Sequence, residues 1–275
     1  MHPWLRGLRS RLPHPWNGRF VAGIPHRVHV ADSMLPNTES TAVGSYVQAG
    51  QSGMDAMRRA LEICDRDLTE MTSVLDLGCG FGRVLRFLCS HVESWKITAC
   101  DLDARAVAFC AAELGAHPLV SKPDLGAVPF GTYDLVWSGS LLTHLPESAS
   151  DAFIALLPKL LKPSGVAVIS FHGEHSLGSL ENLYSGDHAD EARAIREEVG
   201  SRGVSYRAYG ERSVGYDDEG DYGMAWHRWE YLEKRNLALN GDAVSAVGHL
   251  PRGWDDHHDV AIFQARAAHP ASNRD

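Results

Sequence analysis

The sequence predicts an α/β protein built on a doubly wound, mostly parallel sheet. Short apolar runs alternate with segments of helical spacing, beginning with residues 74–77 and the segment after residue 82. This alternation is typical of strands that are connected through helices on both faces of one sheet. Residues 166–171 form an unbroken apolar run, as expected of a strand that is buried on both faces.

The remaining elements follow from the same periodicities. Strands are predicted at residues 74–77, 97–101, 118–120, 133–138, 166–171, 243–250 and 259–265. Helices are predicted at 53–70, from 84 to near 91, and at 106–114, 151–161, 187–199 and 225–237, where apolar residues recur at three- and four-residue steps. Gly115 is expected to end one helix, and a turn at Gly253 and Trp254 is expected to separate the last two strands. The polar stretch 172–223 is predicted to be an insertion or cap on the substrate side.

Charge and cysteine content restrict the classes of function. The formal net charge of −9 argues against nucleic acid as a partner, because phosphate contacts need a basic face. The five cysteines are odd in number and lack zinc-type spacing, which fits reduced thiols. The sequence has no run that could span a bilayer and no apolar core of a signal peptide, so we expect a cytoplasmic protein.

Residues 1–50 are predicted to be a partly ordered arm, followed by a domain at 51–268 and a tail at 269–275. Five arginines precede the first acidic residue, Asp32, and are interleaved with Trp and Leu. This segment could make weak contact with a membrane surface. We favour an arm that packs on the domain, because Pro13 and Pro15 shorten any helix. The oligomeric state is not indicated by any pattern.

The candidate site centres on residues 74–83, which read VLDLGCGFGR. Gly78, Gly80 and Gly82 follow the strand at alternate positions, so bare backbone can approach a ligand closely. Asp76 lies at the mouth of this bend, where a carboxylate repels a pyrophosphate and suits a cation. The spacing also differs from the G-x-G-x-x-G of dinucleotide sites. S-adenosylmethionine, with an ammonium, a sulfonium and no phosphate, is the better match.

Residues 74–83 resemble the first motif of class I S-adenosylmethionine-dependent methyltransferases. Asp101 ends the second strand about 20 residues after the first glycine, which is the spacing of a carboxylate that accepts ribose hydroxyls; Leu102 would flank the adenine. Residues 124–130 resemble the family's D-x-x-x-L-P-F segment, and 133–138 resemble its fourth strand. The resemblance covers about residues 55–268. It implies a Rossmann-like methyltransferase fold with a seven-stranded sheet and an antiparallel last strand.

A cofactor site follows from these motifs. The resemblance implies that Asp124 accepts from the adenine amino group, and Arg83 could pair with the methionine carboxylate or pack on the sheet. The predicted cofactor-binding residues are Asp76, Gly78, Cys79, Gly80, Gly82, Arg83, Asp101, Leu102, Asp124 and Ser138.

Two histidines are candidates for catalysis. Methyl transfer needs in-line alignment and, for a hydroxyl acceptor, a general base. His144 and His172 follow the fourth and fifth strands, and either could be this base or have a structural role. His172, His175, His257 and His258 could also be interpreted as a metal cluster. Their spacing fits no standard ligand set, so we expect no metal.

These patterns together predict an S-adenosylmethionine-dependent methyltransferase that acts on a small-molecule or glycan acceptor, through O-methylation. The glycan class rests on residues 256–260, which resemble a G-H-Q-D-V segment of methyltransferases found with polysaccharide assembly genes. One alternative is a methyltransferase-like binding protein without turnover, which the intact glycines and acidic residues disfavour. The other is an NAD(P)-dependent oxidoreductase, which Asp76 and the glycine spacing disfavour.

Overall fold

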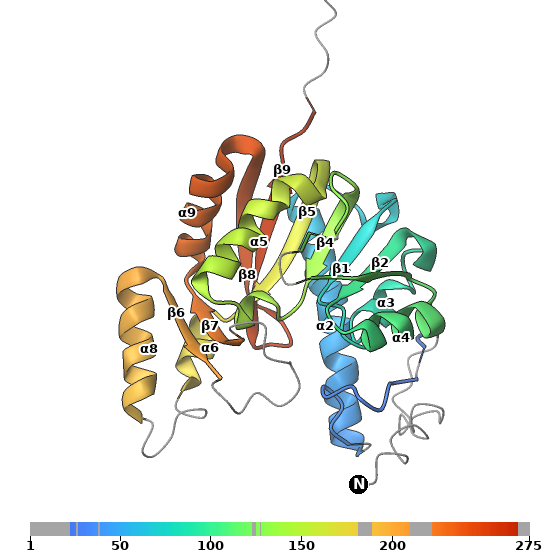
Figure 1. Cartoon of the computed structure of the whole chain (residues 1–275), viewed down its shortest axis with the longest axis horizontal. Coiled ribbons are helices and arrows are strands. Elements are labelled where there is room, and N and C mark those ends of the chain that lie inside the picture. Colours follow the sequence, from blue (N-terminus) through green and yellow to red (C-terminus); the bar gives the residue numbers. More distant parts are fainter. Residues whose placement is uncertain are drawn as a thin grey trace, which may run out of the picture.

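The computed structural model describes residues 23–25, 27–37, 39–122, 125–126, 128–180, 189–209 and 222–268. Its centre is a seven-stranded sheet of order β3-β2-β1-β4-β5-β9-β8 (Figure 1). The strands are β1 (Val74–Leu77), β2 (Ile97–Asp101), β3 (His117–Val120), β4 (Tyr133–Ser138), β5 (Leu161–Phe171), β8 (Val244–Trp254) and β9 (His258–Ala265). Strands β1 to β5 are parallel, and β9 is antiparallel to both of its neighbours. The predicted fold class, including the antiparallel last strand, is confirmed.

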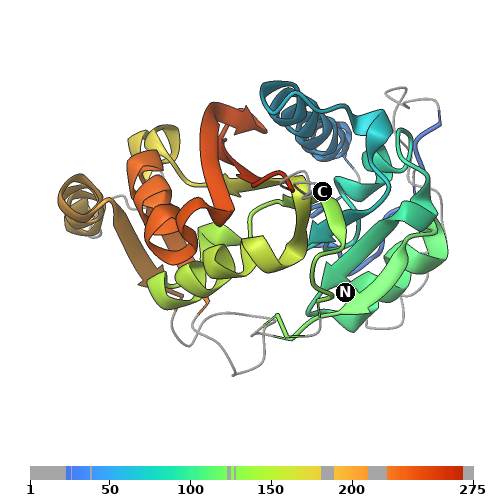
Figure 2. The same cartoon turned by 90° about the horizontal axis from the view of Figure 1, so that it is seen from above.

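Helices cover both faces of this sheet (Figures 1 and 2). The α-helices are α2 (Ser40–Ile63), α3 (Leu85–Leu88), α4 (Ala104–Leu114), α5 (Glu147–Leu160), α6 (Glu174–Gly178), α8 (Ala189–Arg202) and α9 (Trp229–Asn240). Short 3-10 turns occupy η1 (Leu68–Glu70), η2 (Ser94–Lys96), η3 (Leu142–His144) and η6 (Gly241–Ala243). Among the described residues, no helix combines the length and apolar character needed to cross a bilayer.

Strand β5 shows why its sequence is apolar throughout. Val166 and Val168 belong to the core that packs under α2, whereas Ala167 and Ile169 belong to the core on the opposite face. Alternate side chains of a strand point to opposite faces, so a central strand that is covered on both sides needs apolar residues at every position. The expectation from residues 166–171 is confirmed.

Four elements differ from the sequence prediction. Helix α2 spans Ser40–Ile63 rather than residues 53–70, so it runs through residue 50 and ends before the 3-10 turn η1. The helix after the glycines is a single turn, α3, rather than a segment reaching residue 91. The predicted helix 225–237 is divided into a strand, β7 (Gly223–His227), and α9. Strand β8 continues through Trp254, so the last turn comprises residues 255–257.

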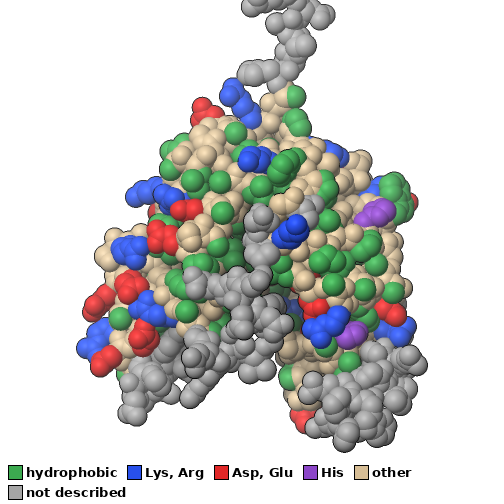
Figure 3. All heavy atoms as spheres, in the orientation of Figure 1, with side chains coloured by type: hydrophobic (Ala, Val, Ile, Leu, Met, Phe, Trp, Pro, Cys, Tyr) green, Lys and Arg blue, Asp and Glu red, His purple; other side chains and the backbone are tan. Residues whose placement is uncertain are grey.

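The stretch after β5 forms a small cap beside the main sheet. Strand β6 (Val204–Ala208) pairs with β7 in an antiparallel ribbon, and α8 packs against it (Figure 1). The cap is attached to β5 through the His227 N–H, which donates to the His172 carbonyl at 2.9 Å. Acidic and basic side chains are interspersed over the outer surface of α8 (Figure 3).

A buried arginine fixes the segment before α2 to the glycine bend. Arg86 has no exposed surface. Its guanidinium donates to the carbonyl oxygens of Pro25 at 2.9 Å and Arg27 at 2.8 Å, and to the Tyr46 hydroxyl at 3.3 Å. It also donates to the carbonyls of Phe81 and Gly82. A buried cation is tolerated only when its donors are satisfied in this way.

Candidate active site

The three glycines of the bend have different roles. All three have positive φ, at 79° for Gly78, 49° for Gly80 and 77° for Gly82. A Cβ at Gly82 would lie 2.6 Å from Leu114 Cδ1, so this glycine allows close packing of α4. Among the described residues, a Cβ at Gly80 would meet no atom within 4 Å, and one at Gly78 only Leu141 Cβ at 3.8 Å. Gly78 and Gly80 therefore face space that a ligand can enter.

Asp101 connects the end of β2 to this bend. Its Oδ2 accepts from the Gly80 N–H at 2.8 Å, and its Oδ1 accepts from the Asp103 N–H at 2.9 Å. Burial raises the pKa of this carboxyl. Each oxygen keeps a further lone pair, so the oriented carboxylate can accept from a vicinal diol. The adjacent Leu102 side chain is 48% exposed and can flank a flat ring.

Asp76 is the opposite case, because the chain does not compensate its charge. Its side chain is 2% exposed, and among the described residues no donor contacts the carboxyl group. Burial, with a smaller contribution from Asp101, raises the pKa of Asp76 to about 8. A cationic ligand would stabilise the ionised form of this group. This electrostatic arrangement suits an ammonium or sulfonium.

Arg83 stacks on the Trp254 ring, with its Cζ 5.1 Å from the ring centroid. Among the described residues no carboxylate forms an ion pair with its guanidinium. The sequence left two possibilities for Arg83, packing on the sheet or pairing with a carboxylate ligand. The side chain packs at the end of the sheet, and its donors remain available to a carboxylate ligand.

For three other predicted cofactor residues, Cys79, Ser138 and Asp124, the structure shows no side chain facing the candidate site. Cys79 directs its thiol into the core, where it donates to the Gly80 carbonyl at 3.4 Å beside Cys110. The Ser138 hydroxyl is fully buried and donates to the Leu77 carbonyl at 3.0 Å, which joins β4 to β1. Neither side chain lines open space, so contact with a ligand through these side chains is not supported. Asp124 lies outside the described residues.

His144 is held by the cap. Its Nδ1 lies 2.7 Å from the Gly223 carbonyl oxygen, so this nitrogen carries the proton and Nε2 is left as the basic atom. The ring stacks on Tyr222 at 4.6 Å, and Nε2 lies 3.5 Å from Ser140 Oγ. Burial lowers the pKa of His144, which keeps the imidazole neutral at physiological pH.

His172 is more enclosed and lies among other histidines. It is 4% exposed, and its Nδ1 lies 3.1 Å from the Ala225 carbonyl oxygen. Burial is the main reason that its pKa is lowered to about 3. The ring nitrogens of His172, His257 and His258 lie within 4.8 Å of one another. The sequence prediction had considered these histidines as a cluster and had set them aside because their spacing is irregular.

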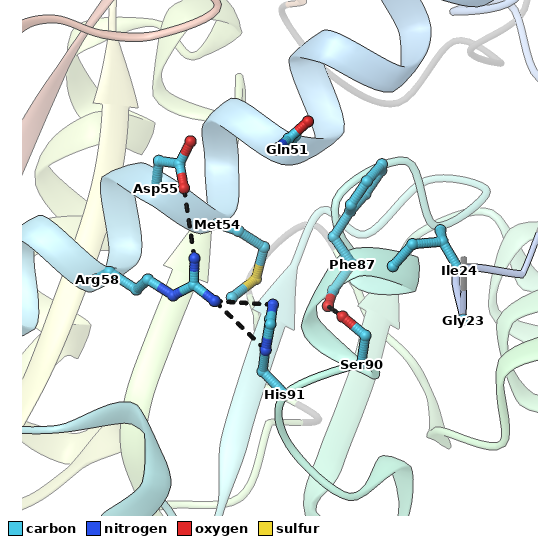
Figure 4. Close-up of a pocket in the computed structure, with 9 residues that line it drawn as sticks. All are labelled: Gly23, Ile24, Gln51, Met54, Asp55, Arg58, Phe87, Ser90 and His91. Carbon is cyan, nitrogen blue, oxygen red and sulfur yellow. Dashed lines mark hydrogen bonds and ion pairs between the residues drawn. The ribbon is translucent and has the colours of Figure 1, made fainter. Parts of the chain in front are cut away.

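A separate cavity of about 390 Å³ lies between α2 and the segment that follows the glycines (Figure 4). Arg58 crosses its wall, with one guanidinium nitrogen 2.8 Å from His91 Nε2 and another 3.5 Å from Asp55. Met54 and Phe87 supply an apolar part of the lining. None of the predicted cofactor or catalytic residues lines this cavity, so we assign it no part in the reaction.

The strand order, the glycine bend and the Asp101 carboxylate are those of the class I methyltransferase fold. Residues 74–165 match the family model of a methyltransferase domain. The chain therefore contains a methyltransferase domain, and its sheet has the class I strand order.

The chain is similar in sequence to two characterised enzymes and in fold to a solved methyltransferase structure. Over 103 residues the chain is 29% identical to the 2-methyl-6-phytyl-1,4-hydroquinone methyltransferase of Synechocystis; the match covers 36% of this chain and only 31% of that enzyme. Over 176 residues it is 24% identical to the carboxy-S-adenosyl-L-methionine synthase of Shewanella baltica, covering 60% and 72% of the two chains. A solved structure with a similar fold is the 1,6-didemethyltoxoflavin-N1-methyltransferase of Burkholderia thailandensis, bound to 1,6-didemethyltoxoflavin and S-adenosylhomocysteine. Its TM-score is 0.50 at 19% identity, covering 82% of this chain and 86% of that one.

Proposed function

We propose that the protein transfers the methyl group of S-adenosylmethionine to an oxygen atom of a small-molecule or glycan acceptor. The orientation of His144 is the observation that carries this proposal. Its Nδ1 is committed to the Gly223 carbonyl, so Nε2 is free to take a proton from an acceptor hydroxyl. Two of the similar enzymes named above, the hydroquinone methyltransferase and the 1,6-didemethyltoxoflavin-N1-methyltransferase, have small-molecule acceptors, which supports this acceptor class.

The cofactor contacts belong to the same proposal. Asp101 would accept from the ribose hydroxyls, and Leu102 would flank the adenine. Asp76 would face the cationic part of the cofactor, with Gly78 and Gly80 providing room for close approach. Arg83 would pair with the methionine carboxylate. Asp124 is retained as the adenine contact.

The reaction needs little from the protein beyond alignment and proton removal. Holding the acceptor oxygen in line with the methyl carbon and sulfur lowers the entropic part of the barrier. A neutral His144 can remove the hydroxyl proton as the oxygen–carbon bond forms and the carbon–sulfur bond breaks. His172 is a weaker candidate for the base, because an imidazole with a pKa of about 3 holds a proton poorly at neutral pH.

The remaining proposals concern the setting of the reaction. We place the enzyme in the cytoplasm and expect no nucleic-acid partner, which agrees with the mixed charges over α8. We keep residues 51–268 as the methyltransferase domain and 172–223 as its substrate-side cap, with the boundary at residue 50 falling inside α2. Four of the five arginines expected near a membrane surface lie before residue 23, outside the described part of the chain. The fifth, Arg27, forms an ion pair with Glu113.

Two measurements test the proposal separately. Calorimetric titration with S-adenosylhomocysteine reports the cofactor site alone, and we expect one site per chain. Incubation with methyl-labelled S-adenosylmethionine and metabolite or glycan extracts, followed by mass spectrometry, reports turnover and should yield a methyl ether. Binding without any labelled product would favour the binding-protein alternative. Labelling at nitrogen or carbon would overturn O-methylation, and absence of binding would contradict the cofactor site.

A further inference from the structure

Three histidines meet at the carboxyl edge of the sheet. His172 directly follows β5, His257 lies in the turn after β8, and His258 begins β9. Because β9 is antiparallel to β5, with Phe171 opposite Asp259, the start of β9 lies beside the end of β5. The ring centroids are 4.8 Å apart for His172 and His258, and 5.1 Å apart for His257 and His258.

His172 and His258 each keep one ring nitrogen available to a ligand, and the Nε2 of His257 lies 3.4 Å from Ser176 Oγ. The Nδ1 of His172 is occupied by the Ala225 carbonyl, which leaves its Nε2 as a lone-pair donor. A backbone carbonyl that fixes the far nitrogen in this way is the usual support of a metal-bound histidine. The Nδ1 of His258 is buried and has no hydrogen-bond partner among the described residues. Burying an unsatisfied ring nitrogen costs stability unless something binds it.

We propose that His172, His257 and His258 bind one divalent transition-metal ion, with zinc as the reference ion, and leave at least one coordination position open. Neutral imidazole is a good ligand for such ions, and three histidines plus an exchangeable water are a known catalytic arrangement. In a tetrahedral site with Zn–N bonds of about 2.1 Å, ligand nitrogens lie roughly 3.4 Å apart. One nitrogen of each ring lies within 4.8 Å of the others, so binding must shorten these separations by at most about 1.4 Å.

The site is continuous with the proposed methyl-transfer centre. Trp254 contacts both: Arg83 stacks on its ring, and the His258 ring lies 5.0 Å away in an edge-to-face arrangement. A catalytic role for the metal rests on the proposed O-methylation. In that reaction the acceptor oxygen would bind at the metal's open coordination position. A bound cation would lower the pKa of that hydroxyl and leave less work for His144.

The test begins with metal binding and needs no acceptor. The full chain is stripped with a chelator and titrated with Co²⁺, whose absorption in the visible range reports tetrahedral nitrogen coordination; Zn²⁺ is then added as a competitor. We expect one Co²⁺ per chain, displaced by one Zn²⁺. His257→Ala and His258→Ala should each weaken Co²⁺ affinity by about 100-fold or more. His249→Ala is the matched control on β8, where the ring stacks on Trp229, and it should bind normally.

S-adenosylhomocysteine calorimetry on the same samples separates the possible failures. Variants that bind this ligand normally are folded, so their loss of Co²⁺ affinity would support the site. If His172→Ala, the most buried change, fails this check, the two other variants still decide. Absence of stoichiometric Co²⁺ or Zn²⁺ binding in the unaltered chain, or binding that neither variant reduces, would overturn the metal site. That result would leave the proposed methyl transfer standing, because cofactor binding is measured independently.

Discussion

The candidate cofactor site and the candidate acceptor site, at opposite ends of the carboxyl edge of the sheet, are formed by different chemical groups. At β1 and β2 the site consists of backbone and carboxylates, which lie within about 25 residues of sequence and are oriented by their own neighbours. At β4, β5 and β9 it consists of imidazoles, and those of His144 and His172 are oriented by carbonyl groups of the cap strand β7. The cofactor end is therefore a local structure. The acceptor end exists only when segments far apart in sequence have folded together.

The largest expected effect concerns the acceptor end. His144→Asn should lower kcat by about 10²- to 10⁴-fold, because the general base is lost, while S-adenosylhomocysteine affinity stays within about twofold. The pKa of His144 is lowered, so the unaltered enzyme should stay active below pH 6.5 and lose activity as pH falls through that lowered value. The variant should lack this limb of the pH profile. His91→Ala, in the separate cavity, is the control; a variant that keeps its acid limb would argue against His144 as the base.

At the cofactor end, Asp101→Ala should reduce affinity for S-adenosylhomocysteine by about 100-fold, because two charge-assisted hydrogen bonds to the ribose are lost. Calorimetry measures this directly. Asp103→Ala is the matched control, since Asp103 caps α4 by accepting from the Arg105 N–H at 2.8 Å. It should cost about 1 kcal/mol of stability and leave affinity intact. Equal loss of affinity in both variants would show that Asp101 acts only through local folding.

The glycines allow a comparison inside the bend itself. Gly82→Ala should lower the free energy of unfolding by about 2–4 kcal/mol, since the new Cβ meets Leu114 and φ is positive. Gly80→Ala should cost about 1 kcal/mol in stability, because its Cβ enters open space, yet it should weaken cofactor binding at least tenfold. Urea unfolding and calorimetry on both variants measure the two effects. The reverse pattern would contradict the assignment of packing to Gly82 and ligand approach to Gly80.

The smallest effect is expected at Asp76. Its pKa of about 8 in the folded chain exceeds the unfolded value near 3.9, so the folded protein holds a proton that the unfolded chain releases. This destabilisation is absent below about pH 4, grows as pH rises toward 8 and is then constant. Without cofactor, Asp76→Asn should raise Tm by at least about 2–4 °C at pH 8 and by less at pH 5. Excess S-adenosylmethionine should remove this advantage, because the unaltered carboxylate then has a cationic partner; a shift independent of pH would refute this account.

The sequence predicted the arrangement at β1 and β2 better than the arrangement of the histidines at β4, β5 and β9. The strand–glycine–helix bend and the position of Asp101 at the end of β2 were predictable, because Asp76, the glycines and Asp101 are signals that lie close together in sequence. The histidine cluster was not, since register between β5 and β9 unites residues 172 and 258, and no local spacing encodes that pairing. Strand β7 was assigned to a helix because Trp226, Trp229 and Leu232 have helical spacing, although Trp226 belongs to the strand and the other two to α9.

The predicted start of α2 was too late because the first half of this helix contains several glycines. Gly44, Gly50 and Gly53 lower helix propensity, which favours a later start in any periodicity argument. Tertiary packing explains why the glycines are tolerated. A Cβ at Gly50 would lie 2.4 Å from the Arg83 carbonyl oxygen, so the helix can lie against the glycine bend only with a bare backbone there.

The buried Arg86 sets a practical limit on how this chain can be divided. A recombinant fragment starting at residue 51 would delete the carbonyls of Pro25 and Arg27 and the hydroxyl of Tyr46. The buried Arg86 guanidinium would then lack three of its five acceptors. We expect such a truncation to be recovered mostly as inclusion bodies, whereas one starting at residue 23 or earlier should yield soluble, protease-resistant material. Residues 23–50 are therefore part of the folded domain, because they supply acceptors for the buried Arg86.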